Sequence, residues 1–160
     1  MNLSADIDLA PYIDHSLLMP TATLEHVDHW CAEAQKYGFA SVCVYPVHVQ
    51  RAADNLHESS IPVGTVIGFP TGAETSASKL FAAQEATEHG ATELDVVINL
   101  GWVKAGQLEQ IHTELAQIIE ATGLCVKAIL EMALLDPSEQ RAVADICMDA
   151  GVSFLMTSTG

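Results

Sequence analysis

The chain has 160 residues, with six Lys and Arg against 21 Asp and Glu, which gives a formal net charge of −15. At 49% hydrophobic and 17% charged residues, it is too apolar to be disordered. The basic residues are scattered singly, which argues against nucleic-acid and anionic-membrane partners. No apolar run reaches the ~18 residues of a membrane span, and the first residues lack a signal-peptide pattern. These features predict one soluble, cytoplasmic domain over residues 1–160.

Short β-rich runs alternate with helical stretches along the chain. We expect strands at residues 11–18, 40–45, 63–69, 93–100, 125–131 and 153–158. The helices are expected at residues 23–37, 47–57, 74–89, 106–121 and 137–150. The strands are nearly continuous Val, Ile and Leu runs, as is typical of parallel strands covered on both faces. The pattern predicts an α/β protein, either an open doubly wound sheet or part of a (β/α)8 TIM barrel. Because no dinucleotide-binding or P-loop glycine motif is present, we favour the barrel, with about six βα units.

The cysteines and histidines do not have the spacing of a metal site. No Cys-x-x-Cys pair occurs, and no two histidines are four residues apart. All four cysteines lie in apolar segments, which predicts reduced and mostly buried thiols: Cys31, Cys43, Cys125 and Cys147. We therefore expect neither a metal site nor a disulfide framework.

Polar residues inside the apolar strands are the candidate site residues, because chemistry in parallel α/β folds lies at the carboxyl ends of the strands. Asp95 and Lys127 stand in the fourth and fifth expected strands. If their faces line a barrel interior, a carboxylate and an ammonium become neighbours in a poorly solvated place. They are then either a buried ion pair that closes the core or a catalytic pair with perturbed pKa values.

The other polar positions each have a structural interpretation as well as a functional one. Cys43 fits a core thiol, and Asp14 fits a cap for the loop that follows it. Lys79 and Lys104 are expected to be solvated helix or loop residues. The run Thr-Ser-Thr-Gly at residues 157–160 suits an anion cradle, but such runs are also common turns.

Six motifs, in order through nearly the whole chain, carry a resemblance to a known family. They are IDHSLL (13–18), VCVYP (42–46), GFPTG (68–72), ELDVVIN (93–99), VKAILE (126–131) and TSTG (157–160). Together they resemble the deoxyribose-phosphate aldolases. The resemblance implies a (β/α)8 barrel and a metal-free class I aldolase without a cofactor. It also implies reversible cleavage of 2-deoxy-D-ribose 5-phosphate to acetaldehyde and D-glyceraldehyde 3-phosphate through a lysine Schiff base.

The resemblance also implies roles for particular residues. Asp95 would be the proton-relay carboxylate, and Lys127 the cation that tunes the reactive lysine. The residues that it places near the substrate or its phosphate are Asp14, Cys43, Thr159 and Gly160. Such a site needs an unprotonated lysine near neutral pH, against a free pKa of ~10.4. A second ammonium and a desolvated pocket both lower that pKa.

One residue departs from the family pattern at the reacting position. The residue before Thr-Ser-Thr-Gly is the Schiff-base lysine in the family, and here it is Met156. A thioether cannot form an imine, so we expect an aldolase by descent that is itself inactive. The alternative is a non-catalytic homologue that uses the scaffold for binding or assembly.

A second departure is length. About six strands are expected where a complete barrel has eight and roughly 200 residues or more. An unclosed parallel sheet exposes two edges and an apolar inner face. We therefore expect the 160-residue chain either to self-associate as a homo-oligomer or to fold only marginally as a monomer.

Light scattering tests this expectation directly. Across a concentration series, the chain should show a mass above that of one 17.1 kDa chain, or else a broad, low-temperature unfolding transition. A stable, tightly folded monomer would contradict it.

Overall fold

The computed structural model describes residues 8–160 and contains a parallel sheet of six strands in the order β1-β2-β3-β4-β5-β6. Each strand pairs with the next one along the chain, in register and in parallel. The strands are β1 (Asp14–Leu17), β2 (Ser41–Val44), β3 (Val63–Ile67), β4 (Glu93–Val97), β5 (Cys125–Ile129) and β6 (Phe154–Met156). This order confirms the α/β class and the parallel sheet expected from the sequence.

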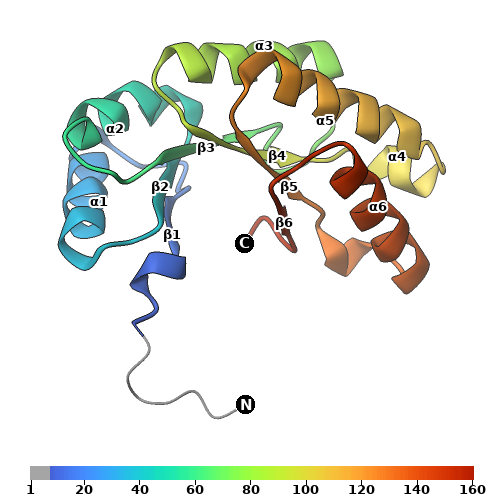
Figure 1. The fold of residues 1–160 in the computed structure, drawn as a ribbon, viewed down its shortest axis with the longest axis horizontal. Coiled ribbons are helices and arrows are strands. Elements are labelled where there is room, and N and C mark those ends of the chain that lie inside the picture. The colour runs from blue at the N-terminus through green and yellow to red at the C-terminus, as the bar shows by residue number, and fades with distance from the viewer. Residues whose placement is uncertain (1–7) are drawn as a thin grey trace.

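Helices connect the strands and lie along the outer side of the sheet (Figure 1). They are α1 (Leu24–Tyr37), α2 (Val49–Leu56), α3 (Ser76–Glu88), α4 (Leu100–Lys104), α5 (Leu108–Thr122) and α6 (Pro137–Asp149). Three short 3-10 turns complete the described elements: η1 (Ala10–Tyr12), η2 (Pro46–His48) and η3 (Met132–Leu134). No helix among residues 8–160 is long and apolar enough to cross a membrane.

The expected elements differ from the observed ones mainly at strand ends. The fourth strand stops at Val97, because Asn99 caps α4 by accepting a hydrogen bond from the Trp102 amide. This one-turn helix was not expected, since five residues are too few to show a helical period. The first strand begins only at Asp14, because Pro11, with its fixed φ, lies in a 3-10 turn.

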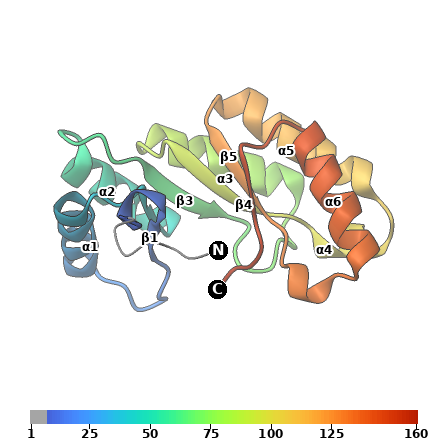
Figure 2. The ribbon, with the colours of Figure 1, turned by 60° about the horizontal axis from the view of Figure 1, so that its bottom comes forward.

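The sheet is curled, and one contact demonstrates the curl. Lys127 Nζ on β5 lies 2.7 Å from Asp14 Oδ2 on β1. In a flat sheet these strands would be four spacings apart, or roughly 19 Å, which is beyond the reach of a lysine. The sheet must therefore bend until its first and fifth strands face each other, and Figures 1 and 2 show the helices wrapped around the convex side.

The two faces of the strands have different compositions. The outward face packs on the helices with residues such as Val42, Leu94 and Val126. The inward face carries the polar residues, because Asp95 is in register with Lys127 and every second residue shares a face. Met156 is in register with Ile129 and so belongs to the same inner face, one residue pair beyond Lys127.

Lys79 corrects an expectation from the sequence. It was expected to be solvated, but its side chain is 0% exposed and lies 2.7 Å from Glu114 Oε1 on α5. Its ammonium also donates to the Val97 carbonyl at the end of β4, at 2.8 Å. Gly68 packs so closely that a Cβ there would lie 2.8 Å from Lys79 Cε. Lys104 is half-exposed and pairs with Glu139, as expected of a surface residue.

We predict that Lys79→Met destabilises the fold by on the order of 3–5 kcal/mol, because it leaves the Glu114 carboxylate buried without its partner. The double change Lys79→Met with Glu114→Leu should recover most of that loss, since no charge is then buried. Urea unfolding followed by circular dichroism measures both. If Lys79→Met alone costs less than about 1 kcal/mol, the buried ion pair of Lys79 and Glu114 does not stabilise the fold as described.

Candidate active site

Lys127 stands at the centre of the inner face, surrounded by three carboxyl groups. Its ammonium lies 2.7 Å from Asp14 Oδ2 on β1 and 2.7 Å from Glu93 Oε2 on β4. Asp95 Oδ1, also on β4, is 3.6 Å away. The sequence prediction that Asp95 and Lys127 are neighbours is therefore confirmed, and the pair belongs to a larger cluster.

Asp14 contacts Lys127 and does not cap the loop that follows β1. Its second carboxylate oxygen accepts a 2.6 Å hydrogen bond from the Ser41 hydroxyl on β2. Burial acts to raise the pKa of Asp14, but the hydrogen bonds from Lys127 and Ser41 outweigh it and hold that pKa below its usual value. Asp14 is therefore ionised at neutral pH.

Asp95 is the most buried carboxyl group of the cluster. Burial raises its pKa above the usual value, while the Lys127 charge and the Cys43 hydrogen bond oppose that rise. The Cys43 thiol donates to Asp95 Oδ2 at 3.4 Å, whereas Asp95 Oδ1 has no hydrogen-bond partner. A buried carboxyl with a raised pKa and one oxygen that accepts no hydrogen bond is suited to accept and return a proton.

Cys43 is a buried, neutral thiol, as its apolar strand predicted. Burial, followed by the nearby Asp95 charge, raises the pKa of Cys43 well above that of a free thiol. A neutral thiol is a poor nucleophile, so Cys43 contributes a weak donor and its bulk to the inner face.

Lys127 is unsuited to be an imine-forming amine itself. Burial acts to lower its pKa, but the charge of Asp95, the hydrogen bond to Asp14 and the close contact with Glu93 together raise that pKa above the usual lysine value. The side chain therefore stays protonated at neutral pH, and a protonated amine cannot attack a carbonyl.

Glu93 is the site residue that sequence reasoning missed. It is the first residue of β4 and lies two positions before Asp95, on the same face. The spacing of two residues from Asp95 could have indicated that Glu93 belongs to the site. However, a polar residue at the start of a strand is also typical of a strand boundary, and the local sequence does not distinguish these two possibilities.

A cavity of about 390 Å³ opens beside this cluster. Lys127, Asp14 and Glu93 form its charged wall. The remaining residues are Pro11, Tyr12, Ala40, Phe154, Leu155 and Met156. Met156 thus lines the same cavity as Lys127.

Thr159 and Gly160 follow β6, near the end of the described chain. The Thr159 amide and hydroxyl both donate to one carboxylate oxygen of Glu131, at 3.1 and 2.6 Å. The Gly160 amide donates to the Ser158 hydroxyl at 3.1 Å. These two amides therefore bond to side chains of this chain, and the anion cradle suggested by the composition stays a prediction.

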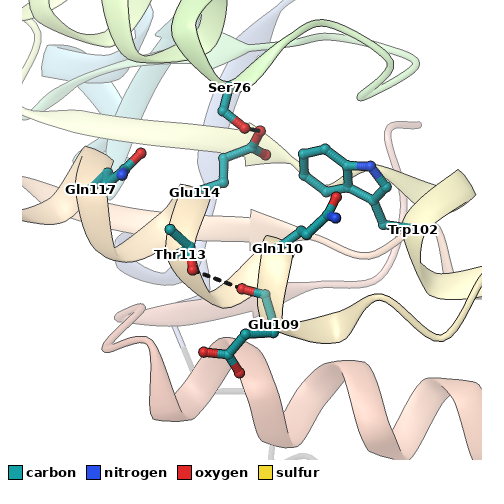
Figure 3. A pocket seen from close by; sticks show the side chains of 7 residues that line it. All are labelled: Ser76, Trp102, Glu109, Gln110, Thr113, Glu114 and Gln117. Carbon is teal, nitrogen blue, oxygen red and sulfur yellow. Dashed lines mark hydrogen bonds between the residues drawn. The ribbon is translucent and has the colours of Figure 1, made fainter.

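A second depression, of about 270 Å³, lies on the outer helices and holds none of the predicted site residues. Figure 3 shows Ser76 and Glu114 in contact there, beside Trp102 and Gln110. Glu114 is already bonded to Lys79 and Ser76. The buried carboxylate of this depression is therefore already satisfied by side chains of this chain.

A curled parallel sheet with titratable groups on its inner face defines a protein of the (β/α)-barrel class with an interior site. Residues 9–152 match the DeoC/LacD family aldolases. A protein of Cyanothece sp. (strain PCC 7425 / ATCC 29141), named deoxyribose-phosphate aldolase, is 60% identical over 157 residues. That alignment covers 98% of this chain and 69% of the relative. The chain belongs to the DeoC/LacD aldolase family.

Solved structures agree with this assignment. The tetrameric deoxyribose phosphate aldolase from Aeropyrum pernix is 36% identical, with a TM-score of 0.87 over 94% of this chain and 64% of its own. The structure described as QR15, an aldolase, is 34% identical, with a TM-score of 0.92 over 96% of this chain and 69% of its own. The chain therefore shares the fold of these aldolases over about two thirds of their length.

We predict that Lys127→Met lowers the stability of the fold at pH 7 by on the order of 3–5 kcal/mol. The change removes the interaction that lowers the pKa of Asp14 and opposes the rise at Asp95, so both folded-state pKa values increase. A carboxyl group whose pKa is higher in the folded than in the unfolded state favours folding as the pH falls. The deficit should therefore narrow between pH 7 and about 4.5.

Denaturant unfolding at several pH values measures this deficit, and Lys127→Arg, which keeps the charge, is the control. A deficit of the same size at every pH would contradict the electrostatic explanation.

Proposed function

We propose that this chain carries the site of a deoxyribose-phosphate aldolase with one essential group replaced. The reaction is the reversible cleavage of 2-deoxy-D-ribose 5-phosphate to acetaldehyde and D-glyceraldehyde 3-phosphate. The observation that carries the proposal is the placement of Met156, which lines the same cavity as Lys127 and lies on the same inner face. With a thioether at the reacting position, the chain as it stands is inactive.

The charges around Lys127 explain which amine would react. Lys127 has three carboxyl neighbours and keeps its proton. A lysine at position 156 would enter a cavity that already contains this ammonium, and of two neighbouring ammonium groups the less compensated one loses its proton first. The amine at position 156 would thus be free to attack near neutral pH.

The remaining groups fit the steps that follow. The amine adds to the carbonyl of acetaldehyde and water leaves, which gives an iminium ion that draws electrons from the adjacent carbon. Asp95, through the oxygen that accepts no hydrogen bond and a water molecule, would take the proton from that carbon and return it in the cleavage direction. Asp14, Cys43, Thr159 and Gly160 would contact the sugar and its phosphate.

A non-catalytic protein that keeps the scaffold for binding or assembly is the second candidate. The observation in its favour is Met156 itself, because a methionine fills the space of a lysine stem without strain and without its charge. The same experiment separates the two candidates.

Borohydride trapping with acetaldehyde, read by intact mass, should give an N-ethyl adduct on the Met156→Lys variant and none on the chain as it stands. Met156→Arg is the matched control, because it adds the charge without an imine-forming amine. Circular dichroism first establishes that all three proteins are folded.

Peptide mapping should place the adduct at residue 156. An adduct on Lys127 in the unmodified chain would refute the view that its ammonium is held protonated. Absence of an adduct on the folded Met156→Lys variant would favour the non-catalytic scaffold.

A further inference from the structure

Glu131 adopts a backbone conformation that its residue type avoids. Its φ of 45° and ψ of 55° lie in the left-handed region, and it is the only non-glycine with a positive φ among residues 8–160. Glycine adopts this conformation without cost, whereas a side chain with a Cβ does so under strain. A strained residue beside a site is a reason to ask what its side chain does there.

The left-handed conformation arises because the segment that follows β5 has one residue more than the segment of β6 that it pairs with. That extra residue is Glu131. The Leu130 amide donates to the Met156 carbonyl at 2.9 Å, and the Met132 amide donates to the next carbonyl, that of Thr157, at 2.8 Å. Two steps along the β5 side thus match one step along the β6 side, which is the pattern of a β-bulge. Bulges often redirect a side chain next to a site.

The redirected side chain reaches the segment after position 156. Its carboxylate oxygen Oε2 accepts hydrogen bonds from the Thr159 hydroxyl at 2.6 Å and from the Thr159 amide at 3.1 Å. Hydrogen bonds to an ionised carboxylate are stronger than those between neutral groups. Residues 130–132 therefore hold residues 156–159 through four hydrogen bonds, two from the backbone and two to this one side chain.

We propose that Glu131 is a positioning residue of the site, whose carboxylate fixes Thr159 and with it the donors of residues 157–160. It touches no reacting atom and acts through Thr159. The functional part of this inference rests on the proposed function, because that proposal makes residues 157–160 a substrate-contacting segment. The structural part, that the carboxylate orders Thr159, stands independently of any activity.

Two substitutions separate the carboxylate from the backbone strain. Glu131→Gly removes two hydrogen bonds but adopts the left-handed conformation without strain, so these opposing effects should leave the stability of the fold nearly unchanged. Glu131→Gln keeps an acceptor oxygen at the same distance but removes the charge. We expect the glycine variant to lose the ordering of Thr159 fully and the glutamine variant to lose it in part.

Amide hydrogen exchange, measured by NMR on the chain as it stands, tests the structural part. Exchange at Thr159 should accelerate by about tenfold or more in Glu131→Gly, with a smaller change in Glu131→Gln and an unchanged melting temperature. Unchanged exchange at Thr159 in Glu131→Gly would overturn the proposal, whatever the activity of the protein.

The functional part is measured with Met156→Lys as the parent. Adding Glu131→Gly should raise KM for 2-deoxyribose 5-phosphate about tenfold. The rate of acetaldehyde trapping, which needs only the amine, should stay within about twofold. If Glu131→Gly slows trapping as strongly as it weakens substrate binding, and also lowers the melting temperature, its role is purely structural and the positioning role is overturned. If Met156→Lys forms no imine, the proposed function fails, and the exchange measurement still decides whether Glu131 holds Thr159.

Discussion

The ammonium of Lys127 joins the first, fourth and fifth strands across the inner face of the sheet. A lysine can contact Asp14 on β1 and both Glu93 and Asp95 on β4 only if the sheet is strongly curled. The converse also holds, because three carboxyl groups on one concave face would repel one another without a central cation. Curvature and charge balance therefore depend on the same side chain. The cavity that Met156 lines is a consequence of both.

The buried ion pair of Lys79 and Glu114 also fixes the position of a strand, from the opposite side of the sheet. Its ammonium holds the Val97 carbonyl, two residues beyond Asp95 on β4. One lysine thus fixes β4 from the helical side, and Lys127 contacts it from the inner side. The position of Asp95 follows from a strand that is held on both faces.

Much of this arrangement could be predicted from the sequence, and what could not has a physical explanation. The alternation of apolar runs and helical stretches gave the parallel sheet, and period two along the strands placed Asp95 and Lys127 on one face. Met156 was singled out only through the resemblance of the six motifs to a known family, because a Thr-Ser-Thr-Gly run by itself is also a common turn. In contrast, Lys79 lies in a helix of ordinary polarity, and its burial depends on Glu114, 35 residues away. Glu131 could be placed at the end of the fifth expected strand, but its contact with Thr159 could not be predicted, since the backbone angle that turns the side chain results from pairing between the segments of β5 and β6.

The proposed function assigns different roles to two amines: carboxylates keep Lys127 protonated, whereas a lysine introduced at position 156 would lose its proton near neutral pH. The pH dependence of imine formation by the Met156→Lys variant tests it most directly. The rate of acetaldehyde trapping should reach half its maximum at a pH well below the ~10.4 of a free lysine. Replacing Lys127 by methionine should move that midpoint upwards, because the neighbouring positive charge is lost. A midpoint at the ordinary lysine value, unmoved by the loss of Lys127, would contradict it.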